Sequence, residues 1–186
     1  MEIRKTEPED LDQVLALYEE ARRFMRDHGN PDQWGMGHPP AEMVQEDIRA
    51  GKSYVCVEDG KLLGVFYFAN EVEPDYAVIY QGAWLNDAPY GVMHRVACPG
   101  RKKGTASFCV AWCLEQSGGN LRIDTHEKNL PMQGMLAKNG FTRCGLIRIS
   151  NGEERVAYHK CCCGSQEASG VRPMWKTGQK QSYKPA

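Results

Sequence analysis

The sequence predicts a single α/β domain, because short strand patterns alternate with amphipathic helical patterns along most of its length. Two hairpin signals, Asp59-Gly60 and Asn151-Gly152, each separate two strand-like runs. Between these hairpins, residues 92–116 have the pattern of a strand, a basic turn and a helix. The chain has 186 residues, which is enough for one domain with a sizeable core.

The N-terminal part of the chain predicts a strand followed by two helices. Residues 2–5 have a strand pattern, and residues 6–9 (TEPE) form a capping box whose threonine is the N-cap. The helix that follows is expected to end near Asp27, before a loop over residues 29–40 and a short helix over residues 41–50. Its apolar side chains recur at helical spacing: Leu11, Val14, Leu15, Tyr18 and Ala21.

The sequence pattern of the rest of the domain predicts strands, with two further helices between them. The strand patterns cover residues 54–58, 62–69, 76–80, 92–98, 120–125, 141–150 and 154–160. Asn129 is a good helix N-cap, and Gly140 stands where a helix-ending glycine is expected. The domain is therefore predicted to occupy residues 1–160.

After residue 160 the composition becomes polar and rich in glycine and lysine, with no amphipathic period. Residues 161–186 are predicted to be a flexible or loosely docked tail. The adjacent thiols Cys161, Cys162 and Cys163 open this segment, and their role is left open.

Charge and composition exclude several classes of function. The formal net charge is −1 and no basic stripe carries interleaved aromatic residues, so nucleic acid is not an expected partner. No apolar run is long enough to cross a bilayer, and the charged N-terminus lacks a signal core. We therefore expect a cytoplasmic protein that does not bind membranes. The eight cysteines include no C-x-x-C pair, and no metal site is predicted.

The turn after Pro99 has the features of an anion site. Residues 101–106 (RKKGTA) combine three basic side chains with Gly104 and Ala106, which leave the backbone open to approach. The first N–H groups of the following helix have no partner within the helix and carry partial positive charge. Neither the Walker pattern nor G-x-G-x-x-G is present, so the turn is not of a common nucleotide-binding type.

This turn resembles the pyrophosphate signature [QR]-x-x-G-x-[GA] of the GNAT acetyltransferases, here Arg101-x-x-Gly104-x-Ala106. Four longer pieces also resemble a branch of small bacterial GNAT proteins, and the resemblance covers roughly residues 1–160. These pieces are ARRFMRDHGNPDQW, GAWLNDAPYGVMHR, LRIDTHEKNLPMQGMLAKNGF and ERVAYHK. GNAT chains likewise place an Asn at the start of a helix and a Gly-Phe pair after it.

The resemblance implies a mixed, mostly antiparallel sheet flanked by helices, in which two neighbouring parallel strands splay apart. It also implies transfer of an acetyl group from acetyl-coenzyme A to an amine of a small molecule or peptide, by direct attack of that amine. A non-catalytic acyl-coenzyme A sensor is the alternative. Members of this fold often form dimers, so a homodimer is a modest expectation by analogy.

The resemblance assigns the cofactor to the two splayed strands and the basic turn. The pantetheine arm would follow the backbone of Val96, Ala97 and Cys98, and an N–H of Val96 or Ala97 would face the thioester oxygen. Asn129 would contact the cofactor from the second strand. The pyrophosphate would lie on the turn residues Arg101, Lys102, Lys103, Gly104, Thr105 and Ala106.

The acid and base are less clearly indicated. Many GNAT enzymes place a Tyr four residues before the Gly of the Gly-Phe pair, and here that position is Leu136. His94 lies on the cofactor strand and His126 ends the neighbouring one, so each is a candidate general base.

The acceptor side is indicated only by aromatic residues. Trp34, Tyr80 and Trp84 lie in segments that border the acceptor site of this fold, where aromatic rings can cage a cation. They can equally serve as packing, and the sequence leaves this alternative open.

Overall fold

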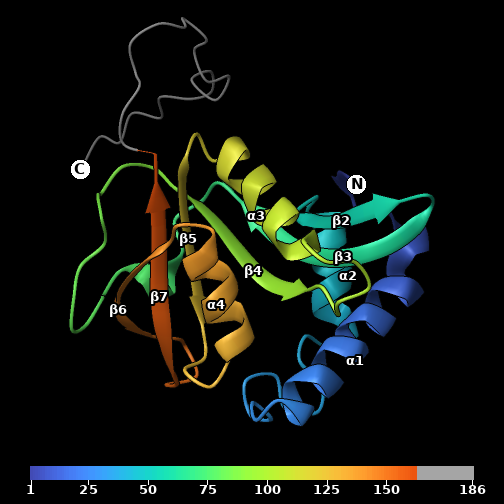
Figure 1. Ribbon diagram of the computed structural model, residues 1–186, viewed down its shortest axis with the longest axis horizontal. Coiled ribbons are helices and arrows are strands. Elements are labelled where there is room, and N and C mark those ends of the chain that lie inside the picture. The colour runs from blue at the N-terminus through green and yellow to red at the C-terminus, as the bar shows by residue number, and fades with distance from the viewer. Residues whose placement is uncertain (163–186) are drawn as a thin grey trace, which may run out of the picture.

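A seven-stranded sheet forms the centre of the computed structural model, which describes residues 1–162 (Figure 1). The order is β1-β2-β3-β4-β5-β7-β6, and every neighbouring pair is antiparallel except β4 and β5. The strands are β1 (Glu2–Lys5), β2 (Ser53–Glu58), β3 (Lys61–Ala69), β4 (Gly91–Ala97), β5 (Asn120–Thr125), β6 (Thr142–Arg148) and β7 (Glu154–Cys161). The predicted mixed, mostly antiparallel sheet is confirmed. Of the predicted tail, residues 161–186, Cys161 belongs to β7, and residues 163–186, with Cys163, lie outside the described residues.

Helices cover both faces of this sheet (Figure 1). On one face, α3 (Thr105–Gln116) and α4 (Leu130–Lys138) pack into a cluster that includes Cys109, Leu136 and the β5 side chains Leu121 and Ile123. On the other face, α1 (Leu11–Asp27) and α2 (Ala41–Arg49) form a second apolar cluster with side chains of β2 and β3. The amphipathic stripe predicted for α1 is the side that packs in this second cluster, where Val14, Leu17 and Tyr18 are buried.

The parallel pair β4 and β5 splits open along its length. The two strands are paired only at Gly91 with Leu121 and at Val92 with Arg122, although β4 continues to Ala97 and β5 to Thr125. Their C-terminal halves therefore diverge. This split confirms the splayed central strands that the GNAT resemblance implies.

A β-bulge lies in the divergent half of β4. Val65 and Tyr67 of β3 face Ala97 and His94 of β4, so β4 has one more residue than β3 between these pairs. Arg95, within this insertion, has a positive φ of 51°, which is strained for a residue with a side chain. A bulge takes its extra residue out of the regular ladder, so backbone groups at this point are available to other partners.

Two local predictions are wrong. Residues 76–80 do not form a strand: the chain has a 3-10 helix, η2 (Pro74–Tyr76), and then a loop with one isolated bridge between Tyr80 and Leu146. Pro74 has no N–H to give to a sheet ladder and favours the first turn of a helix. Thr6 is not an N-cap, because its hydroxyl bonds the Ser53 hydroxyl at 2.7 Å. Glu7 caps the 3-10 helix η1 (Pro8–Asp10) instead.

The loop between η2 and β4 is fastened to the sheet by buried polar groups. His159 of β7 is fully buried, accepts a hydrogen bond from the Leu85 N–H at 3.1 Å, and lies 2.6 Å from the Asn120 Oδ1. The guanidinium of Arg122 lies 4.3 Å from the Trp84 ring and 3.9 Å from the Tyr90 ring. These contacts fix the segment that leads into β4.

The burial of His159 predicts a pH-dependent stability. Burial lowers the pKa of His159 to about 4, whereas an unfolded histidine titrates near about 6.5. The unfolded chain binds the proton more readily, so this stability is fully present above about pH 6.5 and is lost as the pH falls towards about 4. Urea unfolding should show a loss of about 2 kcal/mol between about pH 7 and about pH 5 from this group. The variant His159→Gln should be less stable at neutral pH and lack this part of the pH dependence; an unchanged slope would contradict the assignment.

Candidate active site

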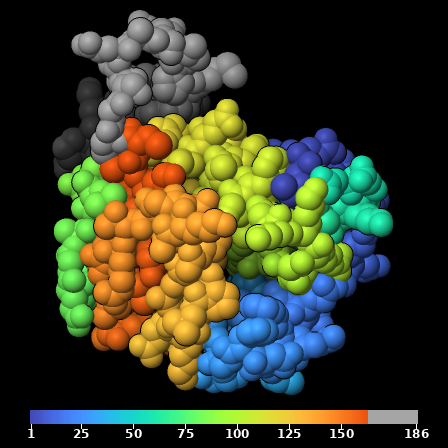
Figure 2. All heavy atoms as spheres, in the orientation of Figure 1, coloured from blue at the N-terminus to red at the C-terminus, as the bar shows by residue number. Residues whose placement is uncertain are grey.

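A cavity of about 420 Å³ opens where β4 and β5 part. Its walls come from β4, β5, η2, α4, the end of α1 with the loop that follows, and the β6–β7 hairpin. Figure 2 shows a recess at this place, between α4, the turn after β4 and the α1 region. The split in the sheet is therefore a cleft at the molecular surface.

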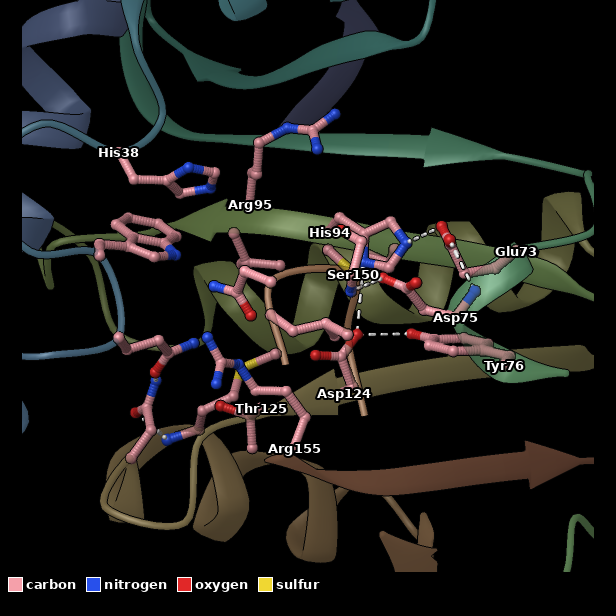
Figure 3. A pocket seen from close by; sticks show the side chains of 18 of the residues that line it. His38, Glu73, Asp75, Tyr76, His94, Arg95, Asp124, Thr125, Ser150 and Arg155 are labelled. Carbon is pink, nitrogen blue, oxygen red and sulfur yellow. Dashed lines mark hydrogen bonds and ion pairs between the residues drawn. The ribbon is translucent and has the colours of Figure 1, made fainter. Parts of the chain in front are cut away.

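Successive side chains of β4 and β5 point to opposite faces of the sheet, so the cavity has an apolar side and a polar side. Met93, Val96 and Met132 belong to the apolar cluster on the α3 and α4 face and line the cavity from there. His94 and Asp124 point to the opposite face, where η2 lies (Figure 3). The cavity thus connects an apolar side near the start of α4 with a polar, acidic side.

His94 is held between two carboxylates on the acidic side (Figure 3). Its Nε2 lies 3.0 Å from Glu73 Oε2, and its Nδ1 lies 3.5 Å from Asp124 Oδ1. The hydrogen bond with His94 lowers the pKa of Glu73 below its usual value, so Glu73 stays ionised at neutral pH. This arrangement can orient the imidazole and stabilise it when it takes up a proton.

Tyr76 and Ser150 donate hydrogen bonds to two carboxylates of this side, Asp124 and Asp75. The Tyr76 hydroxyl donates to Asp124 Oδ1 at 2.7 Å, and the Ser150 N–H donates to Asp75 Oδ2 at 3.3 Å. Burial, and then the charge of Asp124, raise the pKa of Tyr76 well above its usual value. Tyr76 therefore remains a neutral donor that fixes the position of Asp124.

The two arginines that line the cavity are already paired. Arg95 makes two hydrogen bonds to Asp47, at 3.0 and 2.9 Å, and lies 4.4 Å from the centre of the Tyr67 ring. Arg155 donates to Glu153 at 2.6 Å and to a backbone carbonyl at 3.1 Å. Their positive charges are therefore largely balanced within the protein.

The basic turn lies beyond the end of β4, on the surface. Arg101 contacts Glu20 and donates to the Leu62 carbonyl at 3.0 Å, and Lys102 pairs with Glu58 at 2.5 Å. Gly104 precedes α3 with a φ of 92°, a conformation that favours glycine. Residues 101–104 are exposed, and α3 begins at the buried Thr105, whose N–H donates to the Lys102 carbonyl at 3.4 Å. The N–H groups of Ala106 and Ser107 come before the first hydrogen bond of the helix, from Phe108 to Gly104.

Asn129 is the N-cap of α4 and lies at the edge of the cavity. Its side-chain oxygen accepts from the Met132 N–H at 3.2 Å, which is the capping bond expected from the sequence. Its amide donates to Gln33 at 2.9 Å. Gln33 and the buried Trp34 come from the loop after α1, so this loop closes one end of the cavity.

The structure brings together some of the residues that the sequence singles out. His94, Val96, Trp34 and Asn129 line the cavity. Ala97 and Cys98 continue the same strand towards the turn of residues 101–106. These groups lie along one path from the acidic side, through the split, to the start of α3.

Other candidates lie away from the cavity. His126 is outside its lining, and its Nδ1 accepts from the Lys128 N–H at 3.1 Å. Tyr80 is 48% exposed beside β6, and Trp84 packs on Arg122 and His159. The site residues that the sequence reasoning missed include Glu73 and Asp75, whose charged E-x-D pattern around Pro74 has no periodic signal of its own.

Two classes of site are not found in the described part of the chain. Residues 1–162 contain no group of three or more His, Cys, Asp or Glu side chains that could hold a metal ion. No helix among these residues combines the length and the apolar character needed to cross a bilayer.

Comparison with known proteins was made by sequence and by structure. No protein-family model and no curated protein matches this chain. Among solved structures, a GNAT-family acetyltransferase from Streptococcus agalactiae 2603 is 34% identical, with a TM-score of 0.79, covering 86% of this chain and 94% of that one. A chain from Staphylococcus aureus Mu50 is 26% identical, with a TM-score of 0.63, covering 87% and 99%. The yncA protein from Salmonella typhimurium, solved with its cofactor acetyl-CoA, is 12% identical, with a TM-score of 0.59, covering 91% and 98%.

Proposed function

This chain belongs to the GNAT family of acetyltransferases, and we propose that it moves an acetyl group from acetyl-coenzyme A to an amine of a small molecule or peptide by direct attack. The relatives support acetyl transfer as the general class of activity. The observation that carries the finer proposal is the position of His94, which lies in the split between β4 and β5 with carboxylates on both sides.

The residues present fit coenzyme A. The exposed turn at residues 101–104 and the first N–H groups of α3 offer donors for a diphosphate, and a Cβ at Gly104 would meet no atom within 4 Å. The divergent half of β4 offers backbone groups of Val96, Ala97 and Cys98 to an extended arm, with Asn129 across the split. Coenzyme A would supply the acetyl group there as a thioester. The structure of yncA contains its cofactor acetyl-CoA, which supports the same class of cofactor for this chain.

His94 acts as the general base in this proposal. An amine is protonated at neutral pH and must lose a proton to attack. With Nε2–H donating to Glu73, His94 accepts that proton at Nδ1, and Glu73 and Asp124 stabilise the resulting cation. The bulge at Arg95 leaves backbone groups of β4 outside the ladder, so the Val96 N–H can stabilise negative charge on the carbonyl oxygen.

The leaving thiol has no acid at the position common in the family. Leu136 is fully buried in the apolar core between α4 and the sheet, and it has no proton to give. A thiol has an ordinary pKa near about 8.5, so a thiolate can leave without a dedicated acid. Because no proton donor stands at position 136, a non-catalytic acyl-coenzyme A sensor is the second candidate function.

Release of free thiol from acetyl-CoA separates the two functions. In the presence of a panel of primary amines, an acetyltransferase releases coenzyme A in proportion to the acetylated amine. A sensor binds acetyl-CoA, shifts its melting temperature and releases no thiol above the rate without amine. Mass spectrometry of the amine confirms the product.

A variant of the basic turn tests the binding of the cofactor. Arg101→Ala is expected to weaken coenzyme A binding by about 10-fold, because a charge-assisted hydrogen bond contributes about 1.5–3 kcal/mol. Its melting temperature without ligand should change little, since the pair with Glu20 is exposed. Arg143→Ala, which removes an exposed arginine of β6, serves as the matched control. Equal coenzyme A affinity of the two variants would contradict the assignment of the turn.

A further inference from the structure

The charges around the cavity indicate which amines this site accepts. Resting on the proposed function, we infer that the acceptor is a small primary alkylamine or arylalkylamine with no carboxylate next to its amine. Free α-amino acids, which carry that carboxylate, are poor acceptors. Three features support this class: an excess of carboxylates, the absence of an available cation, and a polar group without a partner.

Three carboxylates converge on the polar side of the cavity, where Figure 3 shows Glu73, Asp75 and Asp124 around His94. Their hydrogen-bond partners inside the cavity are the Tyr76 hydroxyl, the N–H groups of Ser150 and Asp75, and the His94 ring. The hydroxyl and the two N–H groups are neutral. This side therefore attracts an ammonium group and repels a second carboxylate beside it.

The arginines of the cavity do not offset this charge. Arg95 is held by Asp47, and the side chains of the two residues are only 17% and 12% exposed. Arg155 is 6% exposed and held by Glu153. A substrate carboxylate would have to displace one of these partners to gain an ion pair, and it would leave that partner without its own.

A separate observation indicates that a polar ligand belongs in this cavity. Thr125, at the end of β5, lines the cavity and is 1% exposed. Its hydroxyl has no hydrogen-bond partner among the described residues. Buried hydroxyls in native proteins are nearly always paired, so this one calls for a partner from outside the present contacts.

Matched amines test the inference. Leucine, leucinamide and isoamylamine share a side chain, and leucinamide keeps the bulk of the carboxyl group without its charge. We expect kcat/KM for isoamylamine and leucinamide to exceed that for leucine at least about 10-fold, a difference of about 1.4 kcal/mol. The pairs tyramine with tyrosine and histamine with histidine should show the same order.

The outcomes distinguish this inference from the proposed function. Equal or better acetylation of the amino acids overturns the inference and leaves the acetyltransferase in place. Acetylation of an N-terminal peptide amine in strong preference to every small amine overturns the small-amine class only. No acetylation of any amine, while acetyl-CoA still raises the melting temperature, overturns the proposed function itself and the inference with it.

Asp75→Asn gives a second test that does not rely on the choice of amine. Asp75 contacts the Ser150 N–H and is not bonded to His94, so it attracts the amine without taking part in the proton transfer. We expect KM for isoamylamine to rise several-fold with little change in kcat, and the discrimination against leucine to shrink. Added salt should raise KM of the unaltered protein more than that of the variant. Asp12→Asn, which removes an exposed carboxylate of α1, is the charge-matched control, and identical kinetics for the two variants would overturn the inference.

Discussion

Replacement of His94 by Gln is expected to lower kcat for acetyl transfer by about 10²–10⁴-fold, the usual contribution of a positioned general base. Glutamine retains hydrogen-bonding capacity near Glu73 and Asp124 but cannot take up a proton at neutral pH. The side chain is 19% exposed and not part of the apolar core, so the fold should tolerate the change. Thiol release and product mass report the loss, and calorimetry with coenzyme A reports binding.

The interpretation of this variant depends on two companions. His126→Gln should keep most of the activity, because His126 lies outside the cavity lining. Glu73→Gln should lower the rate less than His94→Gln, since Glu73 orients the base and does not itself receive the proton. Loss of activity in His126→Gln with full activity in His94→Gln would reverse the assignment of the base. Loss of coenzyme A binding in His94→Gln would show that its defect is not in the chemical step.

The chain order of strands and helices was predictable because each element carries its own local signal. The periodic apolar stripe of α1, the Asn129 cap and the two Gly-containing hairpins act over a few residues. The split between β4 and β5 has no such signal and came from family resemblance. Pairing that stops after Val92 depends on what the next residues of both strands contact, which periodicity does not encode.

The site was predictable only in part, because few of its residues lie next to a local sequence signal. His94 could be placed in the cleft because it lies on the strand that precedes the basic turn. Its partner Glu73 comes from a different part of the chain, and the sequence gives no register between η2 and β4. Trp84 illustrates the opposite case, since an aromatic residue near the site in sequence packs on Arg122 and His159 in space. Contacts made through loops are therefore the part that sequence patterns leave undetermined.

A substitution in the loop between η2 and β4, which contains the half-buried Trp84, is expected to have a large effect on stability. At Gly82, a Cβ would lie 1.9 Å from the Cys144 carbonyl oxygen of β6. Across the same contact, a Cβ at Gly145 would lie 2.5 Å from the Tyr80 carbonyl oxygen. Because both clashes involve backbone atoms, neither can be relieved by a change of rotamer. Gly82→Ala should lower the free energy of unfolding by about 2–3 kcal/mol.

Gly134 is the matched control, and its expected effect has the opposite sign. It lies in the exposed interior of α4, and a Cβ there would meet no atom within 4 Å. Gly134→Ala should raise the free energy of unfolding by about 0.5–1 kcal/mol, because alanine loses less backbone entropy in a helix. Urea unfolding at one pH measures both variants. If Gly82→Ala were as stable as the unaltered protein, the loop between η2 and β4 would not be packed against β6 as the contacts of Gly82 and Gly145 indicate.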